Sequence, residues 1–145
     1  MPTTLGYRLE PDWNGYPPHI SRDDLELWKR YRSSARKEAI AFYFDVGVGG
    51  QTEVPEGTEP ELARMWLHHT QKRIDVLIQT ILSWVICELR HNATAAAAGR
   101  LLQYKNLWGK EPIDEMSVTL RLITDRFDPD LQSLLNEINI EYVIL

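Results

Sequence analysis

The sequence predicts an α/β fold: a mixed, partly antiparallel sheet flanked by helices. The first reason is a pair of apolar runs, residues 73–79 and 84–90, whose side chains alternate with the period of a strand. The link between the two runs is too short for a crossover connection, so they should form an antiparallel hairpin. The second reason is that helical and strand patterns alternate on both sides of this hairpin. The expected order is helix, strand, strand, strand, helix, strand, helix, strand, or αβββαβαβ.

Length and composition limit the class of protein. The chain has 145 residues, which favours one domain with a sizeable core, and a formal net charge of −5. That charge argues against a protein that coats nucleic acid, although a local basic patch is compatible with it. The one cysteine, Cys87, has no partner for an internal disulfide, which suits a reducing compartment. The start shows no secretory-signal pattern and no apolar run approaches the ~18 residues of a membrane span, so a cytoplasmic protein with no membrane association is expected.

Two segments are expected to be irregular. Residues 1–20 are rich in Pro, Gly and aromatic residues and should form an arm in front of an α/β domain at residues 21–145. The aromatic side chains of the arm either cover the protein's own surface or dock on a partner, since exposed aromatics make good interface anchors. Residues 49–61 begin with two glycines and continue as an acidic, Pro-containing loop. Both segments are candidate contacts for protein partners in an assembly.

The N-terminal half of the domain supplies one helix and one strand. Ser21 is an N-cap with Asp24 at the third helical position, so a helix should begin there. Residues 39–48 are apolar and aromatic and should form a strand. Residues 61–69 fit either a short helix or the approach to the next strand. Basic side chains on the outer faces of the first helix are either solvated or in contact with phosphate: Lys29, Arg30, Arg36 and Lys37.

A third helix-like segment follows the central hairpin. Capped by Asn92 or Thr94, it should run to about Trp108, and its small AAAAG side chains should let it lie close to the sheet. Such close packing would also explain Gly99, which lowers helix stability by roughly 1 kcal/mol.

Two strands and one helix complete the chain. Residues 117–126 form the first strand. Asp128 followed by Pro129 marks the start of the helix, because proline is favoured at the first helical position. Residues 140–145 form the last strand, so the C-terminus is expected inside the sheet.

The central hairpin carries charged side chains in an apolar setting. If its turn centres between Ile81 and Leu82, Asp75 lies directly opposite Glu88. Arg90 is two residues further along and points to the same face. Like charges opposed across strands are destabilising unless something compensates them. A metal ion, Arg90 or solvent could do so.

Two short motifs give these residues a family context. Asp75 is followed thirteen residues later by Glu88-Leu89-Arg90, and then by a helix that contains GRLLQY at residues 99–104. This pattern resembles that of the PD-(D/E)XK, or restriction-endonuclease-like, nuclease superfamily, in particular its small stand-alone members of the kind encoded in phage genomes. The resemblance covers residues 21–145 in the order of the elements and the central segment from Arg73 to Tyr104 in the motifs.

The resemblance implies a metal-dependent site. In this family the Asp and Glu hold one or two Mg²⁺ ions, or Mn²⁺, which activate water and stabilise charge on the scissile phosphate. Asp75 and Glu88 would be the metal ligands, with the backbone carbonyl of Cys87 or Leu89 completing the set. The lysine that follows the Glu by two residues faces the attacking water and the phosphate, and here that position is Arg90.

The chain departs from the family at two positions. Arg90 replaces the lysine, and arginine, which stays protonated, cannot act as a base. Arg100 stands where the family usually has glutamine, on the same helix face as Tyr104, and these two residues would support phosphate binding. Both replacements keep or add positive charge, so phosphate binding could survive while cleavage is lost. Cys87 points to the opposite face from Glu88 and is expected in the core rather than as a nucleophile.

Two functions from different classes are compatible with these residues. The first is a catalytically impaired or inactive nuclease fold with a structural or assembly role, such as a component of a phage virion. The two arginines and the net negative charge favour it. The alternative is a Mg²⁺-dependent DNA endonuclease or exonuclease in which Asp75 and Glu88 bind the metal and Arg90 clamps the phosphate; the intact carboxylate pair favours it. If the chain is phage-encoded, the resemblance implies the host cytoplasm or the virion as its location.

Overall fold

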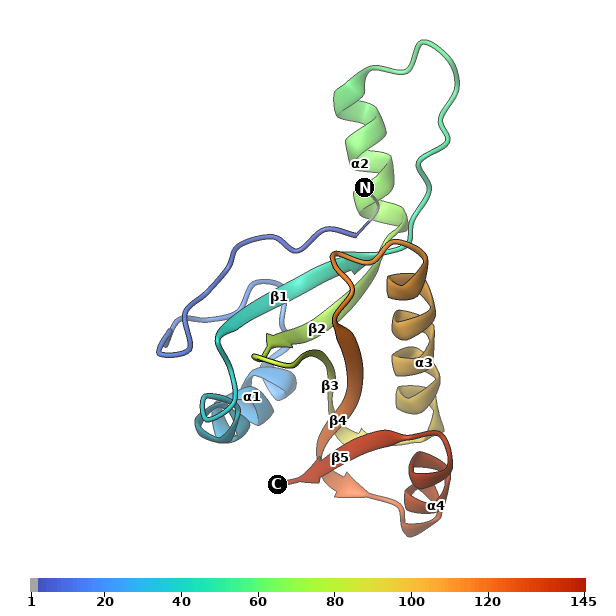
Figure 1. Cartoon of the computed structure of the whole chain (residues 1–145). Coiled ribbons are helices and arrows are strands. Elements are labelled where there is room, and N and C mark those ends of the chain that lie inside the picture. Colours follow the sequence, from blue (N-terminus) through green and yellow to red (C-terminus); the bar gives the residue numbers. More distant parts are fainter. Residues whose placement is uncertain (1–2) are drawn as a thin grey trace.

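The computed structural model describes residues 3–145, which form four helices and five strands (Figure 1). Their bounds are α1 Arg22–Ala35, β1 Ala41–Val48, α2 Pro60–Thr70, β2 Lys72–Gln79, β3 Ser83–Ala93, α3 Ala95–Lys110, β4 Ser117–Phe127, α4 Pro129–Glu137 and β5 Ile140–Ile144. The predicted α/β class and order of elements are confirmed with one addition: residues 61–69, for which the sequence allows helix or strand, lie in α2. Within residues 3–145, no helix combines the length and apolarity needed to cross a membrane.

All five strands form one sheet in the order β1-β2-β3-β4-β5. β1 pairs antiparallel with β2, and β2 pairs antiparallel with β3. β3 pairs parallel with β4, and β4 with β5, because α3 and α4 provide the crossover connections. The predicted mixed, partly antiparallel sheet is therefore confirmed. The expectation that the C-terminus lies inside the sheet is wrong, since β5 is the last strand in the order and forms an edge. Its charged Glu141 and partly exposed side chains suit an edge strand.

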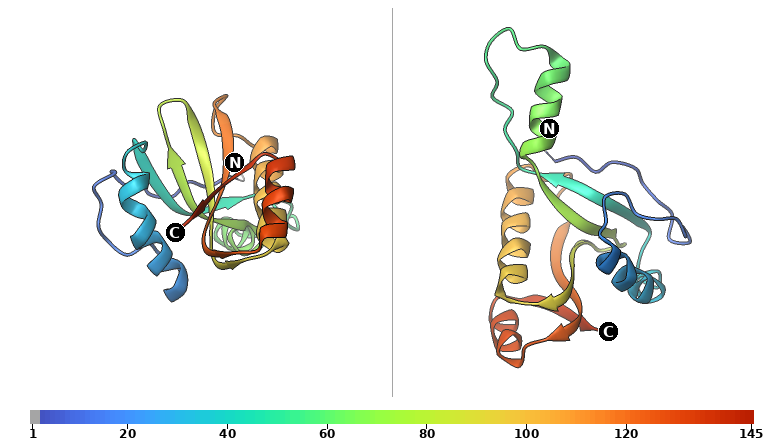
Figure 2. Two further views of the ribbon diagram at one scale, coloured as in Figure 1. Left: turned by 90° about the horizontal axis from the view of Figure 1, so that it is seen from below. Right: turned by 180° about the vertical axis from the view of Figure 1, so that it is seen from behind.

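Helices α1 and α3 cover opposite faces of the sheet (Figure 2). The buried stripe of α1 recurs at helical spacing and includes Trp28, whose ring meets Phe42 and Phe44 edge-on at centroid distances of 5.0 and 5.2 Å. On the other face, α3 packs Tyr104 and Trp108 into a second apolar cluster. Each face of the sheet thus has its own core.

The alanine-rich start of α3 lies close to the sheet, as predicted, because Ala97 and Ala98 are buried. Gly99 does not take part in that contact: it is exposed, and a Cβ atom added to it would meet nothing within 4 Å. The expectation that close packing explains Gly99 is therefore wrong, and nothing in the structure of residues 3–145 explains a glycine there.

Side chains cap two helices where the sequence indicates. Ser21 accepts a hydrogen bond from the backbone N–H of Asp24 at 3.1 Å, and Asp128 accepts one from the N–H of Asp130 at 2.9 Å. Thr94 occupies the N-cap of α3 with extended backbone. These caps satisfy backbone donors that the first helical turn leaves free, and they fix where α1 and α4 begin.

The N-terminal arm runs along the outer edge of β1. Thr4 and Leu9 pair with the backbone of β1, and Trp13 packs against Phe44 with ring centroids 5.5 Å apart. Arg36, just after α1, donates hydrogen bonds to arm carbonyl oxygens, including that of Trp13 at 3.0 Å. The arm therefore covers part of the protein's own surface, and Arg36 anchors the arm instead of facing solvent freely.

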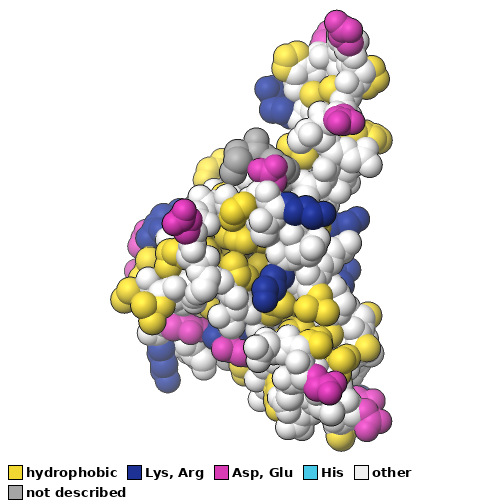
Figure 3. Space-filling view, turned by 45° about the vertical axis from the view of Figure 1, so that its right-hand side comes forward, with side chains coloured by type: hydrophobic (Ala, Val, Ile, Leu, Met, Phe, Trp, Pro, Cys, Tyr) yellow, Lys and Arg dark blue, Asp and Glu magenta, His cyan; other side chains and the backbone are white. Residues whose placement is uncertain are grey.

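Helix α2 and the loop before it project away from the sheet (Figure 1). Every residue of α2 keeps part of its surface exposed, and Leu62, Met65 and Trp66 are about half exposed. With Val54 and Pro55 of the loop they line a pocket of about 540 Å³. The space-filling view shows hydrophobic side chains along this projection and acidic side chains near its tip (Figure 3). Apolar surface gathered in this way is typical of an interaction site.

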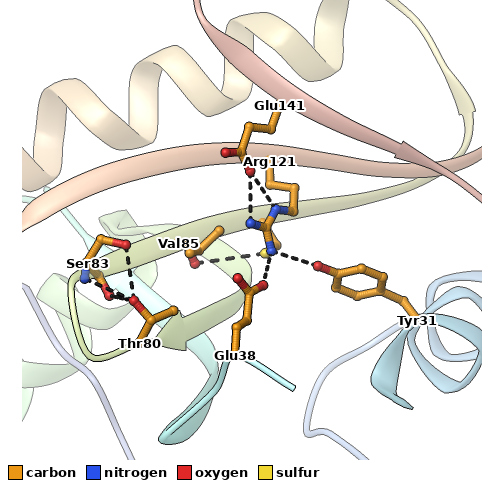
Figure 4. Close-up of polar contacts among 8 residues, drawn as sticks. Tyr31, Glu38, Thr80, Ser83, Val85, Arg121 and Glu141 are labelled. Atoms are coloured by element: carbon orange, nitrogen blue, oxygen red, sulfur yellow. Dashed lines mark hydrogen bonds and ion pairs between the residues drawn. The ribbon is translucent and has the colours of Figure 1, made fainter. Parts of the chain in front are cut away.

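Arg121 of β4 links three elements on the α1 face of the sheet (Figure 4). It donates to the hydroxyl of Tyr31 in α1 at 2.7 Å, pairs with Glu38 before β1, and pairs with Glu141 of β5 at 2.8 Å. The network joins the edge strand β5 to α1 and to the sheet, so we assign it a structural role.

Candidate active site

The site expected from the sequence lies where β2 and β3 separate. Their backbone pairing ends at Val76 opposite Cys87, in the register expected from the turn. One position further, Asp75 comes opposite Glu88, and Oδ2 of Asp75 accepts a hydrogen bond from the backbone N–H of Leu89 at 2.9 Å. This bond satisfies a donor that the end of the ladder leaves free, and it holds the Asp75 carboxylate at the junction of the two strands.

The carboxyl group of Glu88 is fully buried, and only one of its two oxygens accepts a hydrogen bond from an arginine. Its Oε2 accepts a hydrogen bond from Nε of Arg100 at 2.9 Å and lies 3.8 Å from Nη2 of Arg90. Its Oε1 is buried and has no N–H or cationic partner among the described residues, and the carboxyl group of Asp75 is the other polar neighbour of Glu88. Burial, followed by the neighbouring carboxyl group of Asp75, raises the pKa of Glu88 to about 9, against the opposite effect of the two arginines. Two acids this close need a shared proton or a cation between them.

Arg100 connects this pair of acids to α3. Besides its contact with Glu88, it donates from Nη2 to the hydroxyl of Tyr104 at 3.0 Å. Burial, followed by the charge of Glu88, raises the pKa of Tyr104 to about 12, so the hydroxyl stays protonated. The structure thus brings together all the site residues named from the sequence: Asp75, Glu88, Arg90, Arg100 and Tyr104. Their roles as metal ligands or catalytic groups stay predictions.

Sequence reasoning misses three charged side chains that border the site: Asp24, Asp45 and Arg73. Asp24 of α1 is near enough to Asp75 that, after burial, this second carboxylate raises the pKa of Asp24. Asp45 and Arg73 line a cavity of about 110 Å³ together with Asp75 and Arg100. The available signal for Asp45 is its place in the middle of an apolar strand. Asp24 gives no such signal, because helix capping already accounts for it.

The donors at this site suit a hard divalent cation. Asp75 and Glu88 offer carboxylate oxygens, and Oε1 of Glu88 lacks a positive partner. Within residues 3–145, no group of three or more His, Cys, Asp or Glu side chains is arranged to hold a metal ion. Two carboxylates match the donors of an ion such as Mg²⁺, which keeps several waters and is bound by one or two carboxylates and a substrate phosphate.

Cys87 lies on the other face of β3, in the core under α1. Its thiol is buried, and burial raises its pKa to about 12, so it is a poor nucleophile. We expect the native protein to be inert to a thiol-specific reagent such as DTNB and to react at its single cysteine after denaturation. Rapid reaction of the native protein would contradict this placement.

Comparisons with known proteins bear on the fold. No family model matches the sequence, and no curated protein is detectably similar to it. A solved structure, the crystal structure of a repair endonuclease from Pyrococcus abyssi, superposes on the chain with a TM-score of 0.52 at 15% sequence identity. The match covers 92% of this chain and 49% of that one, so the chain spans about half the length of the endonuclease.

The chain shares its fold with about half of that endonuclease. At 15% identity, the match concerns the arrangement of helices and strands and not the chemistry. The chemistry has to be argued from the side chains that this fold brings together at Asp75 and Glu88.

Proposed function

We propose that the chain is a metal-dependent nuclease of the PD-(D/E)XK type that hydrolyses phosphodiester bonds in DNA, with arginine at the position of the family's lysine. The observation that supports this most is the buried Oε1 of Glu88, which has no cationic partner and lies beside the carboxyl group of Asp75. Two buried carboxyl groups in contact need either a shared proton or a cation between them, and a divalent cation is a partner that both carboxylates can share.

The arrangement is unfavourable for a protein that needs only a stable core. Two acids in contact lower the stability of the folded state, because one of them must hold a proton at a pH where it would lose it in water. An apolar residue in place of Glu88 would avoid that cost. Features that conflict with stability are expected at functional sites, so this pair favours an enzyme over a fold kept as a scaffold.

The side chains have different roles at such a site. A bound Mg²⁺ or Mn²⁺ supplies Lewis-acid chemistry, activating water and offsetting charge on the phosphate. Asp75 and Glu88 hold the ion. Arg90, whose side chain is 38% exposed, can contact a substrate phosphate. Arg100 orients Glu88, and Tyr104 orients Arg100 through its hydroxyl.

A second candidate is a nuclease-fold scaffold without catalysis. The 2.9 Å contact between Arg100 and Glu88 favours it, since a guanidinium there competes with a metal ion for the carboxylate. The projecting α2 also favours it, because its exposed apolar side chains suit a protein contact. In that case residues 1–20 and 49–61 would contact protein partners in an assembly such as a phage virion, and the ion pair would be structural.

DNA cleavage tests the proposal. The purified protein should nick or degrade plasmid and linear DNA with Mg²⁺ or Mn²⁺ and not with EDTA. Asp75→Asn should lower the rate at least about 100-fold, because it removes a metal ligand. Millimolar Mg²⁺ should also raise the melting temperature of the wild type and not of Asp75→Asn, since a ligand that binds only the native state stabilises it.

Asp12→Asn makes the same chemical change at an exposed position and serves as the control, with cleavage and metal response like the wild type. If the wild type neither cleaves DNA nor melts at a higher temperature with metal, the nuclease proposal is wrong and the scaffold hypothesis is favoured.

A further inference from the structure

A hollow separates the N-terminal arm from β1. The arm is bonded to the strand at Thr4 and at Leu9, through backbone hydrogen bonds of 2.8 to 3.0 Å. Between these two bridges Leu5 packs on the core, and Arg8 donates hydrogen bonds to Gln79 and to the backbone carbonyl of Ile40. The hollow beside this part of the arm has a volume of about 450 Å³, which is within the roughly 300–1,000 Å³ of typical small-molecule sites. We call it the arm pocket, and its chemically distinctive lining residues are Tyr7, Trp13, His19, Phe44, His68 and Arg73.

The arm pocket adjoins the carboxylate site. Pro18, His19, Asp45 and Arg73 line both the arm pocket and the smaller cavity at Asp75. Because the two cavities share these four lining residues, a ligand group bound at Asp75 lies next to the arm pocket. A phosphodiester held at the carboxylates would therefore have a neighbouring nucleoside within reach of the pocket.

The lining has the chemistry of a base-binding site. Tyr7, Trp13 and Phe44 supply aromatic rings, and the rings of Trp13 and Phe44 lie 5.5 Å apart between centroids. His19 and Arg73 add polar and positively charged groups, of which His19 lies 3.9 Å from the acidic Asp45 and Arg73 donates to the backbone of His68. Aromatic rings that stack on bases, next to cationic groups that face the backbone, are the usual composition of a site for single-stranded nucleic acid.

Tyr7 is the most exposed large hydrophobic side chain among the described residues. Its side chain is 89% exposed at the edge of the pocket. Gly6 before it has a φ of 76°, a left-handed conformation that favours glycine. An aromatic ring held in water gains burial only when another molecule covers it. The ring is thus available for a ligand.

We propose that the arm pocket binds an unpaired nucleotide of single-stranded DNA, with its base stacked on Tyr7 and Trp13 and the adjoining phosphodiester at Asp75 and Glu88. This rests on the proposed nuclease function and adds a substrate class to it. The substrate is single-stranded DNA or a single-stranded end, because a base in a duplex stack cannot enter the pocket.

Fluorescence anisotropy with a labelled oligothymidylate tests this. The Glu88→Gln protein is used in EDTA, so that the DNA stays intact, and it should bind the single strand more tightly than a blunt duplex of equal length. Tyr7→Ala in this background should weaken single-strand binding about 5- to 150-fold, which is the range that corresponds to 1–3 kcal/mol of base stacking. The melting curve should not change, because the Tyr7 side chain is exposed.

Tyr16→Ala is the matched control. Tyr16 is also an exposed tyrosine of the arm, 73% accessible, but it lies against Lys29 and not in the arm pocket. Its removal should leave single-strand binding unchanged.

The outcomes separate this inference from the proposed function. Equal single-strand affinities of Tyr7→Ala and Tyr16→Ala, no preference over the duplex, or no measurable binding would overturn the arm pocket as a nucleotide site, even if the wild type cleaves DNA with Mg²⁺. Binding that depends on Tyr7, together with a wild type that cleaves nothing, would uphold the arm pocket and refute the nuclease.

Discussion

Glu88→Gln is expected to abolish metal-dependent cleavage and, at the same time, to make the protein more stable at mildly alkaline pH. Glutamine keeps the shape of a protonated glutamic acid: its carbonyl oxygen can accept from Arg100, and its amide can donate to Asp75. It offers no negative charge to a divalent ion, so the cleavage rate should fall at least about 100-fold. The stabilising effect of Mg²⁺ should disappear with it.

The gain in stability follows from proton linkage. The carboxyl group of Glu88 has an ordinary pKa of 4.5, and burial beside Asp75 raises it to about 9 in the folded protein. Between these two values the folded protein holds a proton that the unfolded chain has released. The free energy of unfolding therefore falls as pH rises, by up to about 1.4 kcal/mol per pH unit. This contribution is fully present below about pH 4.5 and is lost as pH rises through about 9.

Urea unfolding in EDTA, compared between wild type and Glu88→Gln from about pH 5 to pH 8, measures this effect. The variant should gain an advantage that grows with pH and reaches on the order of a few kcal/mol. Glu137→Gln, at an exposed position in α4, is the control and should follow the wild type. If Glu88→Gln proves less stable than the wild type at pH 8, then Glu88 is ionised in the fold and its pairing with Arg100 holds it, as the scaffold hypothesis requires.

The central hairpin was the part of the fold most accessible to sequence reasoning, because two physical constraints act on it together. The alternation of apolar residues determines which side chains share a face of the sheet. The short link between the strands allows one antiparallel register. That register puts Asp75 opposite Glu88 without any knowledge of the rest of the chain. The caps at Ser21 and Asp128 were accessible for a similar reason, since they depend on local hydrogen bonds.

Features that depend on contacts between distant segments could not be predicted in the same way. Helix α2 packs no fully buried residue into the core, although Leu62, Met65 and Trp66 recur at helical spacing and line a pocket with the loop before it. Its place outside the sheet depends on contacts that spacing along the chain does not show. The apolar character of residues 140–145 indicates contact with the sheet. The position of β5 at the edge depends on where the crossover through α4 returns the chain to the sheet. Asp24 and Asp45 reach the site from elements remote in sequence, so spacing along the chain gives no warning of them.

The contact between Arg100 and Glu88 also depends on how distant segments pack, so the sequence does not predict it. Helical spacing places Arg100 and Tyr104 on one face of α3, but it does not say how that face is rotated against the sheet. The structure turns it so that Arg100 reaches Glu88 and Arg90 is the more distant cation. The roles of Arg90 and Arg100 can therefore be separated by experiment.

Arg100→Gln and Arg90→Lys are expected to change different quantities. Arg100→Gln removes the cation closest to Glu88, at 2.9 Å, so the Mg²⁺ concentration for half-maximal cleavage should fall on the order of tenfold. Arg90→Lys keeps the positive charge, and the side chain of Arg90 is 3.8 Å from Glu88, so the Mg²⁺ concentration for half-maximal cleavage should stay nearly unchanged. It should instead raise the rate at saturating Mg²⁺ about 10- to 100-fold, because an ammonium can exchange a proton beside the attacking water and a guanidinium cannot.

Cleavage rates measured across a Mg²⁺ titration give both quantities for each variant. Arg126→Lys, the same change at an exposed position at the end of β4, should alter neither. The scaffold hypothesis makes the opposite forecast for Arg90→Lys: no cleavage at any Mg²⁺ concentration and a lower melting temperature, since a planar arginine is the better partner for a carboxylate. If both variants are inactive and Arg90→Lys melts lower than the wild type, the arginines hold the acids together in place of a metal ion, and the enzyme hypothesis is wrong.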